Sequence, residues 1–242
     1  MTAAATASRQ DALRDNLAAV RHRIDLATEA AGRSRGSVTL TAITKTYPAT
    51  DIAILSELGV TDIGEARVQE ASAKRVDLGA TPTVRWHLIG QLQRNKVNPA
   101  VAWADVVESV DRVGLVAPLA RAAQFHAKNL DVLIQVDLDN RDIPDRGGAN
   151  PDQVGELADL IATQPGLTLA GVMAVAPLGV DPARAFERLV RVHADLLANH
   201  PGAVVRSAGM SGDLERAIAA GATHVRIGTA LLGSRPVVGY GA

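Results

Sequence analysis

The segment LTAITKTYP, residues 40–48, ends an apolar, β-branched run with Lys45. The chain has only four lysines against twenty-one arginines, so a lysine at the end of a predicted buried strand is unusual here. A lysine that is partly shielded from water has a lowered pKa, and its neutral amine attacks aldehydes to form a Schiff base. The alternative is a lysine that reaches solvent or pairs with a carboxylate such as Glu65.

Two glycine-containing turns near the end of the chain predict an anion site. In SAGMSGDLERAIAAG, residues 207–221, small residues end a strand and a helix is predicted to begin at Ser211. In VRIGTALLG, residues 225–233, a strand runs into Gly228 and Thr229. Helix starts expose unpaired amides that bind phosphate, and glycines let an anion approach closely. The alternative for the first turn is an N-cap in which Ser211 serves only its own helix.

Two further polar residues lie in strand-like runs. Arg226 occupies an apolar strand, where an unpaired charge is costly, so we expect a carboxylate or a ligand atom beside it. His87, in WHLIGQLQRNK (86–96), has the chemistry of a catalytic base, but a hydrogen-bonded interior histidine is the favoured interpretation. The six histidines show no metal-binding spacing and the chain has no cysteine, so no metal site is predicted.

Short β-branched runs alternate with helical patterns, which is typical of repeated βα units. Eight such strands in about 200 residues predict a single α/β domain, a (β/α)8 TIM-type barrel, preceded by an extra helix at about residues 8–31. A doubly wound open sheet is the structural alternative, because strand order cannot be read from sequence. The predicted strands are 38–44, 60–63, 84–89, 105–110, 131–137, 168–175, 203–207 and 223–227.

Composition bounds the other possibilities. The net charge of −1 and the scattered charges favour neither nucleic acid nor a membrane surface as partner. No apolar run approaches the ~20 residues of a membrane span, and the first ten residues lack the apolar core of a signal peptide. No linker divides the chain, so we expect one domain over residues 1–242, disordered at 1–7. We further expect a cytoplasmic monomer.

A lysine on the first strand, with phosphate-binding turns after the seventh and eighth, suits pyridoxal 5'-phosphate (PLP), which carries an aldehyde and a phosphate. Over nearly its whole length the sequence resembles the pyridoxal phosphate homeostasis proteins, whose fold is like the N-terminal barrel of bacterial alanine racemase. The motifs that carry the resemblance are AITKTYP, GEARVQE (64–70), WHLIGQLQRNK, GVMAVAP (171–177), SAGMSGDLERAIAAG and VRIGTALLG.

The resemblance implies a role for each matching residue. Lys45 would form the internal aldimine, and Arg226 would face the pyridine nitrogen. The phosphate would be surrounded by Ser207, Ser211, Gly228 and Thr229, with Ile89, Gly209 and Met210 also at the cofactor. The family's usual GEN motif reads GEA here, so Ala66 stands in the asparagine position and is not assigned to the site.

The resemblance also implies a function without a strong catalytic activity. The protein would buffer PLP inside the cell and deliver it to PLP-dependent apo-enzymes, with no catalytic residue of its own. The alternative is a single-domain PLP-dependent amino-acid racemase, which would need a second acid-base group, and Tyr47 and Tyr240 are the only tyrosines. A barrel that binds another phosphorylated metabolite without a covalent bond is a third possibility.

Overall fold

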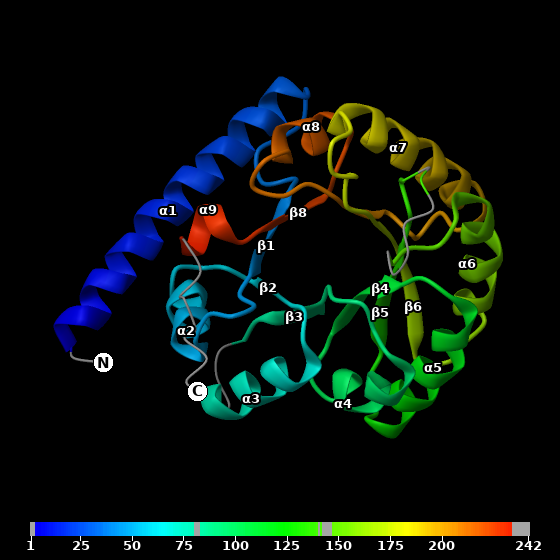
Figure 1. Ribbon diagram of the computed structural model, residues 1–242, viewed down its shortest axis with the longest axis horizontal. Coiled ribbons are helices and arrows are strands. Elements are labelled where there is room, and N and C mark those ends of the chain that lie inside the picture. The colour runs from blue at the N-terminus through cyan, green and yellow to red at the C-terminus, as the bar shows by residue number, and fades with distance from the viewer. Residues whose placement is uncertain (1–2, 80–82, 140, 142–146, 234–242) are drawn as a thin grey trace.

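The computed structural model describes residues 3–79, 83–139, 141 and 147–233. Its strands form one closed barrel in the order β1 to β8, with every neighbouring pair parallel, and the helices surround it (Figure 1). The predicted (β/α)8 barrel is therefore confirmed, and the open-sheet alternative is wrong. The strands are β1 (Thr39–Ile43), β2 (Asp62–Glu65), β3 (Arg85–Leu88), β4 (Val106–Val110), β5 (Leu130–Gln135), β6 (Leu167–Met173), β7 (Val205–Ser207) and β8 (His224–Ile227).

Helices follow the strands as the apolar periodicity predicts. The longest of the outer ring begins at Pro182, where Asp181 caps it by accepting a hydrogen bond from the amide of Ala183. The α-helices are α1 (Ala3–Ala30), α2 (Ala49–Glu57), α3 (Val68–Leu78), α4 (Val97–Val101), α5 (Val116–Phe125), α6 (Val154–Ala162), α7 (Pro182–Asn199), α8 (Leu214–Ala219) and α9 (Thr229–Leu232). Single 3-10 turns are η1 (Arg94–Lys96), η2 (Val113–Leu115) and η3 (Pro151–Gln153).

Helix α1 is the predicted extra helix before the barrel, and it packs against α8 and α9 (Figure 1). It begins at Ala3, within the segment 1–7 for which we expected disorder, and residues 1–2 lie outside the described residues. The run AAATA accounts for the earlier start, because alanine has the highest intrinsic helix propensity. None of the helices in the described part of the chain is long and apolar enough to cross a membrane.

Successive residues along a strand point alternately to the outside and to the interior of the barrel. On β8, Val225 and Ile227 pack outward into the main hydrophobic cluster, whereas Arg226 lies between them and reaches side chains of the barrel interior. On β3, Leu88 belongs to the same outer cluster and His87 points inward. Part of the interior is apolar, with Val106, Leu133 and Met173 packed together. Other interior positions hold the polar and charged residues of the network described below.

Candidate functional site

Lys45 lies just beyond the carboxyl end of β1, in the turn that leads to α2, and is partly buried. The next residue, Thr46, has a φ of 72°, which a β-branched residue adopts only under constraint from its surroundings. Barrel strands present their functional residues at this end. The predicted position of the lysine at the mouth of the barrel is confirmed.

The residues on either side of Lys45 are held by a buried ion cluster. Lys74 Nζ, on α3, donates to the carbonyl of Thr44 at 2.8 Å and contacts one carboxylate oxygen each of Glu65 and Glu70 at 2.7 Å. Thr44 donates its hydroxyl to Glu65 at 2.6 Å, and the amide of Thr46 donates to Glu70 at 2.5 Å. Glu65 therefore pairs with Lys74.

This cluster fixes the turn that carries the lysine. Burial raises the pKa of Glu65 above its ordinary value, although the Lys74 ammonium and the Thr44 hydroxyl act in the opposite direction. For Glu70, burial would raise the pKa, but hydrogen bonds from Lys74 and the Thr46 amide outweigh it and lower the pKa. Lys74, Glu65 and Glu70 thus bond the two residues on either side of Lys45. These bonds restrict the conformation of the backbone at Lys45.

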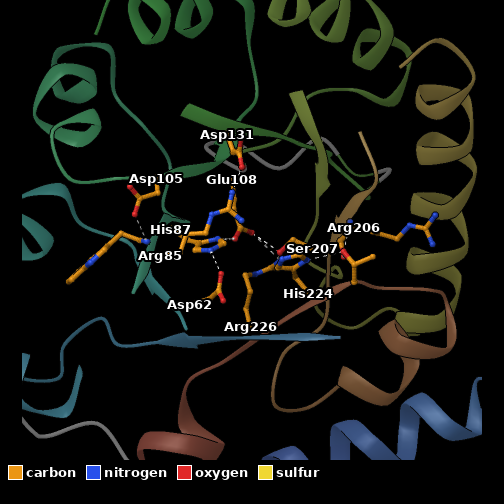
Figure 2. A network of polar contacts seen from close by, with 12 residues as sticks. Asp62, Arg85, His87, Asp105, Glu108, Asp131, Arg206, Ser207, His224 and Arg226 are labelled. Atoms are coloured by element: carbon orange, nitrogen blue, oxygen red, sulfur yellow. Dashed lines mark hydrogen bonds and ion pairs between the residues drawn. The ribbon is translucent and has the colours of Figure 1, made fainter. Parts of the chain in front are cut away.

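Arg226 is almost fully buried on β8 and has the partners that its position requires (Figure 2). Its Nη1 donates to the hydroxyl of Ser207 at 2.7 Å, and its Nη2 donates to the carbonyl of Ala174 at 2.7 Å. Glu108 lies 3.8 Å from Nη1. Among the described residues Nε has no hydrogen-bond partner, so the guanidinium keeps a donor for a ligand.

The arginine belongs to a chain of hydrogen bonds that crosses the barrel (Figure 2). Ser207 donates to Glu108 at 2.6 Å, and the other oxygen of Glu108 contacts His87 Nδ1 at 2.7 Å. His87 Nε2 contacts Asp62 at 2.9 Å. The chain of contacts therefore runs from Arg226 through Ser207, Glu108 and His87 to Asp62. All five side chains are buried.

The network holds His87 in its charged form. Burial alone would lower the pKa of His87, but hydrogen bonds to Asp62 and Glu108 outweigh it and raise the pKa to about 9. Burial would raise the pKa of Glu108, but His87 and Arg226 lower it to about 2. His87 is therefore a hydrogen-bonded interior residue, as the favoured interpretation predicted, and its raised pKa favours the imidazolium form. Burial lowers the pKa of the neighbouring His224, whose ring centroid is 6.4 Å from that of His87.

The two glycine turns lie after β7 and β8, and β8 is the strand that pairs with β1 in the closed barrel. Gly209 has a φ of 93°, and a Cβ there would lie 2.5 Å from the Cβ of Ala217. Gly228 precedes α9, and a Cβ on it would lie 3.5 Å from the carbonyl oxygen of Ile43 at the end of β1. The second turn therefore lies against the strand that leads to Lys45.

Ser211 does not cap α8 as predicted. The helix begins at Leu214, after Asp213, whose carboxylate accepts from the amide of Met210 at 2.6 Å. The Ser211 hydroxyl instead accepts a long hydrogen bond of 3.4 Å from the amide of Ala230 in α9. Because an aspartate draws the chain into a tight turn before the helix, Ser211 faces the neighbouring turn and links the two.

The other predicted site residues also lie at this end of the barrel. Ile89 follows β3 and donates its amide to the carbonyl of Glu65. Thr229, the first residue of α9, is exposed, and Met210 is 39% exposed. Sequence reasoning missed Asp62 and Glu108, although an acidic residue within an apolar strand is the same signal that identified Arg226. Among the described residues, no group of three or more histidine and acidic side chains could hold a metal ion.

Comparison with known proteins shows which family the chain resembles. Residues 16–236 match the family described as alanine racemase, N-terminal domain. A pyridoxal phosphate homeostasis protein of Mycobacterium leprae is 43% identical to the chain, with 93% of each covered.

Solved structures agree with this assignment. A protein of unknown function from Bifidobacterium adolescentis has a TM-score of 0.85 at 33% identity, covering 93% of this chain and 96% of that one. PipY of Synechococcus elongatus, solved with PLP bound, has a TM-score of 0.79 at 31% identity, covering 91% of this chain and 100% of that one. The chain therefore belongs to the pyridoxal phosphate homeostasis protein family, whose barrel is that of the alanine racemase N-terminal domain.

Proposed function

We propose that this protein binds PLP, holds it covalently through Lys45, and serves in PLP homeostasis by buffering and delivering the cofactor. The observation that carries the proposal is the convergence of Lys45, Arg226 and the two glycine turns at one end of the barrel, on the adjacent strands β7, β8 and β1. The relative PipY, whose structure contains PLP, supports the choice of ligand.

The donor set fits the chemistry of this cofactor. When bound, PLP supplies an aldehyde that condenses with an amine, releasing water, and a conjugated ring that accepts electrons. The Lys45 amine would take the aldehyde carbon, and the free Nε–H of Arg226 would donate to the ring nitrogen. The phosphate would lie between the turns that contain Ser211 and Gly228, with Thr229 beside it.

The structure refines two of the predicted roles. Ser207 is fully buried, and its hydroxyl both donates to Glu108 and accepts from Arg226. We therefore infer that Ser207 acts on the ring side, by positioning Arg226, and that it is not a phosphate ligand. Gly209 acts through its backbone, because its positive φ and the contact with α8 leave no room for a side chain.

A non-enzymatic role is favoured over the racemase alternative. The curated relatives are named as homeostasis proteins. A racemase of this type needs an acid-base group on the second face of the cofactor, and the Tyr47 hydroxyl is bonded to the carbonyl of Gly233 at 2.6 Å. Tyr240 lies outside the described residues. Chiral analysis after incubation with individual L-amino acids tests this point, and turnover would contradict the carrier role.

The decisive experiment is borohydride reduction of PLP-loaded protein, followed by peptide mapping. With only four lysines, the modified peptide identifies the attachment site without ambiguity. We expect the adduct on Lys45 and its loss in Lys45→Ala. Lys128→Ala is the matched control, because Lys128 bonds the carbonyls of Ala102 and Ala104 in the segment before β4, at the opposite end of the barrel. Full labelling of the Lys45→Ala protein would refute the assignment.

Other parts of the proposal have their own tests. We propose that apo-enzymes are transient recipients, which cofactor transfer to a purified PLP-dependent apo-enzyme would measure. We also propose that the chain acts as one cofactor-binding domain, since a single large hydrophobic cluster joins α1 to the barrel and its helices. The monomeric state and the cytoplasmic location stay predictions, to be checked by sedimentation and by cell fractionation.

A further inference from the structure

Three side chains of α1 donate hydrogen bonds to backbone carbonyls of the two glycine turns and their short helices. Arg9 Nη2 donates to Leu232 at 3.1 Å and Asn16 Nδ2 donates to Leu231 at 3.0 Å, both in α9. Arg23 Nη2 donates to Ser211 at 3.1 Å, in the turn after β7. A helix that precedes the barrel in sequence therefore contacts the turns after β7 and β8.

The three donors lie on one face of α1. They are seven residues apart, a spacing that returns to nearly the same side of an α-helix. Each lies three or four residues from a member of the apolar stripe that buries the helix, which consists of Leu13, Leu17, Val20 and Ile24. Apolar packing places the helix on α8 and α9, and the polar row beside it reaches the carbonyls.

Two of the three acceptors are carbonyls at the end of the short helix α9. Helix α9 is a single turn of four residues, too short to be stable by itself. The last carbonyls of this helix accept from α1, and Gly233, just after it, accepts from the Tyr47 hydroxyl. A cationic donor such as Arg9 is also favourable at a helix C-terminus. At the other end of α9, the first amides belong to the residues that directly follow Gly228 in the turn after β8.

The strands close without α1, since β1 pairs directly with β8 and all other neighbours pair in sequence. We propose that α1 is a brace that fixes the two turns relative to each other, and that its polar row, chiefly Asn16 and Arg23, determines the preference for the phosphorylated form of the cofactor. This inference rests on the proposed function. Asn16 and Arg23 act as positioning residues, because their hydrogen bonds go to the backbone behind the turns.

Two variants and one control test the brace. Asn16→Asp keeps the shape of the side chain but removes its donor, and Arg23→Ala loses the bond to Ser211 together with an exposed pair to Glu215. Arg9 is left intact, because it also neutralises the buried Asp51. Arg21→Ala is the matched control. Arg21 is another α1 arginine with backbone acceptors, but it donates to Gly59 in the segment before β2, at the opposite end of the barrel.

Absorbance titration of wild type and variants with PLP and with pyridoxal, which lacks the phosphate, gives the first readout. We expect the Asn16→Asp, Arg23→Ala double variant to bind PLP roughly tenfold more weakly, since two hydrogen bonds are lost. Affinity for pyridoxal should change by less than about twofold, and Arg21→Ala should leave both unchanged. An equal loss for both ligands, or no loss for PLP, would overturn the proposal.

Hydrogen exchange of the ligand-free protein gives a second readout that does not depend on the bound cofactor. In the double variant, the amides of residues 207–213 and 228–232 should exchange faster than in wild type, and exchange elsewhere in the barrel should be unchanged. Unaltered exchange in these two segments would refute the brace. A wild-type protein that binds neither ligand would refute the proposed function, and the exchange measurement would still decide whether α1 holds the turns.

Discussion

Glu108 and Asp62 together hold the charge of His87, and Glu108→Gln tests the contribution of Glu108. The substitution keeps the shape of the side chain and removes the charge that faces His87 at 2.7 Å and Arg226 at 3.8 Å. His87 then keeps only Asp62 as an anionic partner. Because burial disfavours the imidazolium, we expect the pKa of His87 to fall from about 9 toward or below its ordinary value of 6.5.

The size of the effect follows from the shift of that pKa. A rise from 6.5 to about 9 corresponds to about 3 kcal/mol of stability, because one pKa unit is worth about 1.4 kcal/mol. The folded pKa lies above the unfolded one, so this stability is fully present below pH 6.5 and is lost as the pH rises through 9. The variant should therefore be less stable than wild type by about 3 kcal/mol near pH 6.5, with a smaller difference near pH 9.5.

The assay is urea unfolding at steps between pH 6.5 and 9.5, with NMR titration of the histidine rings. Burial lowers the pKa values of His193 and His224, whereas that of His87 is raised, so the NMR titration distinguishes His87 from these two buried rings. Glu187→Gln, at an exposed position of α7, is the control. A wild-type His87 that titrates below pH 6.5, or a stability difference that does not depend on pH, would refute the reasoning.

Three further predictions concern the turns, the lysine cluster and the ring nitrogen. Gly209→Ala should cost about 1–2 kcal/mol or more of unfolding free energy and weaken PLP binding, whereas Gly212→Ala, with open space at its Cβ, should be close to neutral in unfolding free energy. Lys74→Met should destabilise the protein by ~3–5 kcal/mol in urea unfolding, because it leaves Glu65 charged and buried, and adding Glu65→Gln should restore much of the loss. Arg226→Glu made together with Glu108→Gln, which avoids two adjacent carboxylates, should protonate the ring of bound PLP. An absorbance spectrum unchanged with pH would count against the electronic role of Arg226.

The fold and the position of the candidate site could be predicted because both depend on local pattern. Most strands contain β-branched residues, and Lys45 directly follows a strand end, so the barrel topology alone brings it beside the turn of Gly228. Helix α7 is likewise marked in the sequence, by Pro182 at its start and by a clear apolar periodicity.

The internal network could not be predicted, because it depends on pairs that are distant in sequence. Ser207 and Glu108 are 99 residues apart, and they meet only because β4 and β7 face each other across the closed barrel. Arg226 was recognised as needing a partner, but the sequence does not say which of several acidic residues faces inward at the same height. The alternative in which Ser211 only caps its own helix is wrong, because Asp213, two residues later, occupies that turn.

The arrangement of charges is compatible with the proposed role of Arg226 beside the ring nitrogen of PLP. Glu108 is shared between His87 and Arg226, and Asp62 supplies the second negative charge, so the four charged groups balance. Since Glu108 lies 3.8 Å from the guanidinium and bonds the intervening Ser207, Arg226 is fixed in place without having all its donors occupied. A fixed cation beside the ring nitrogen disfavours its protonation and so weakens the ring as an electron acceptor. The same residues that hold the cofactor would therefore limit its reactivity, which suits storage and delivery better than turnover.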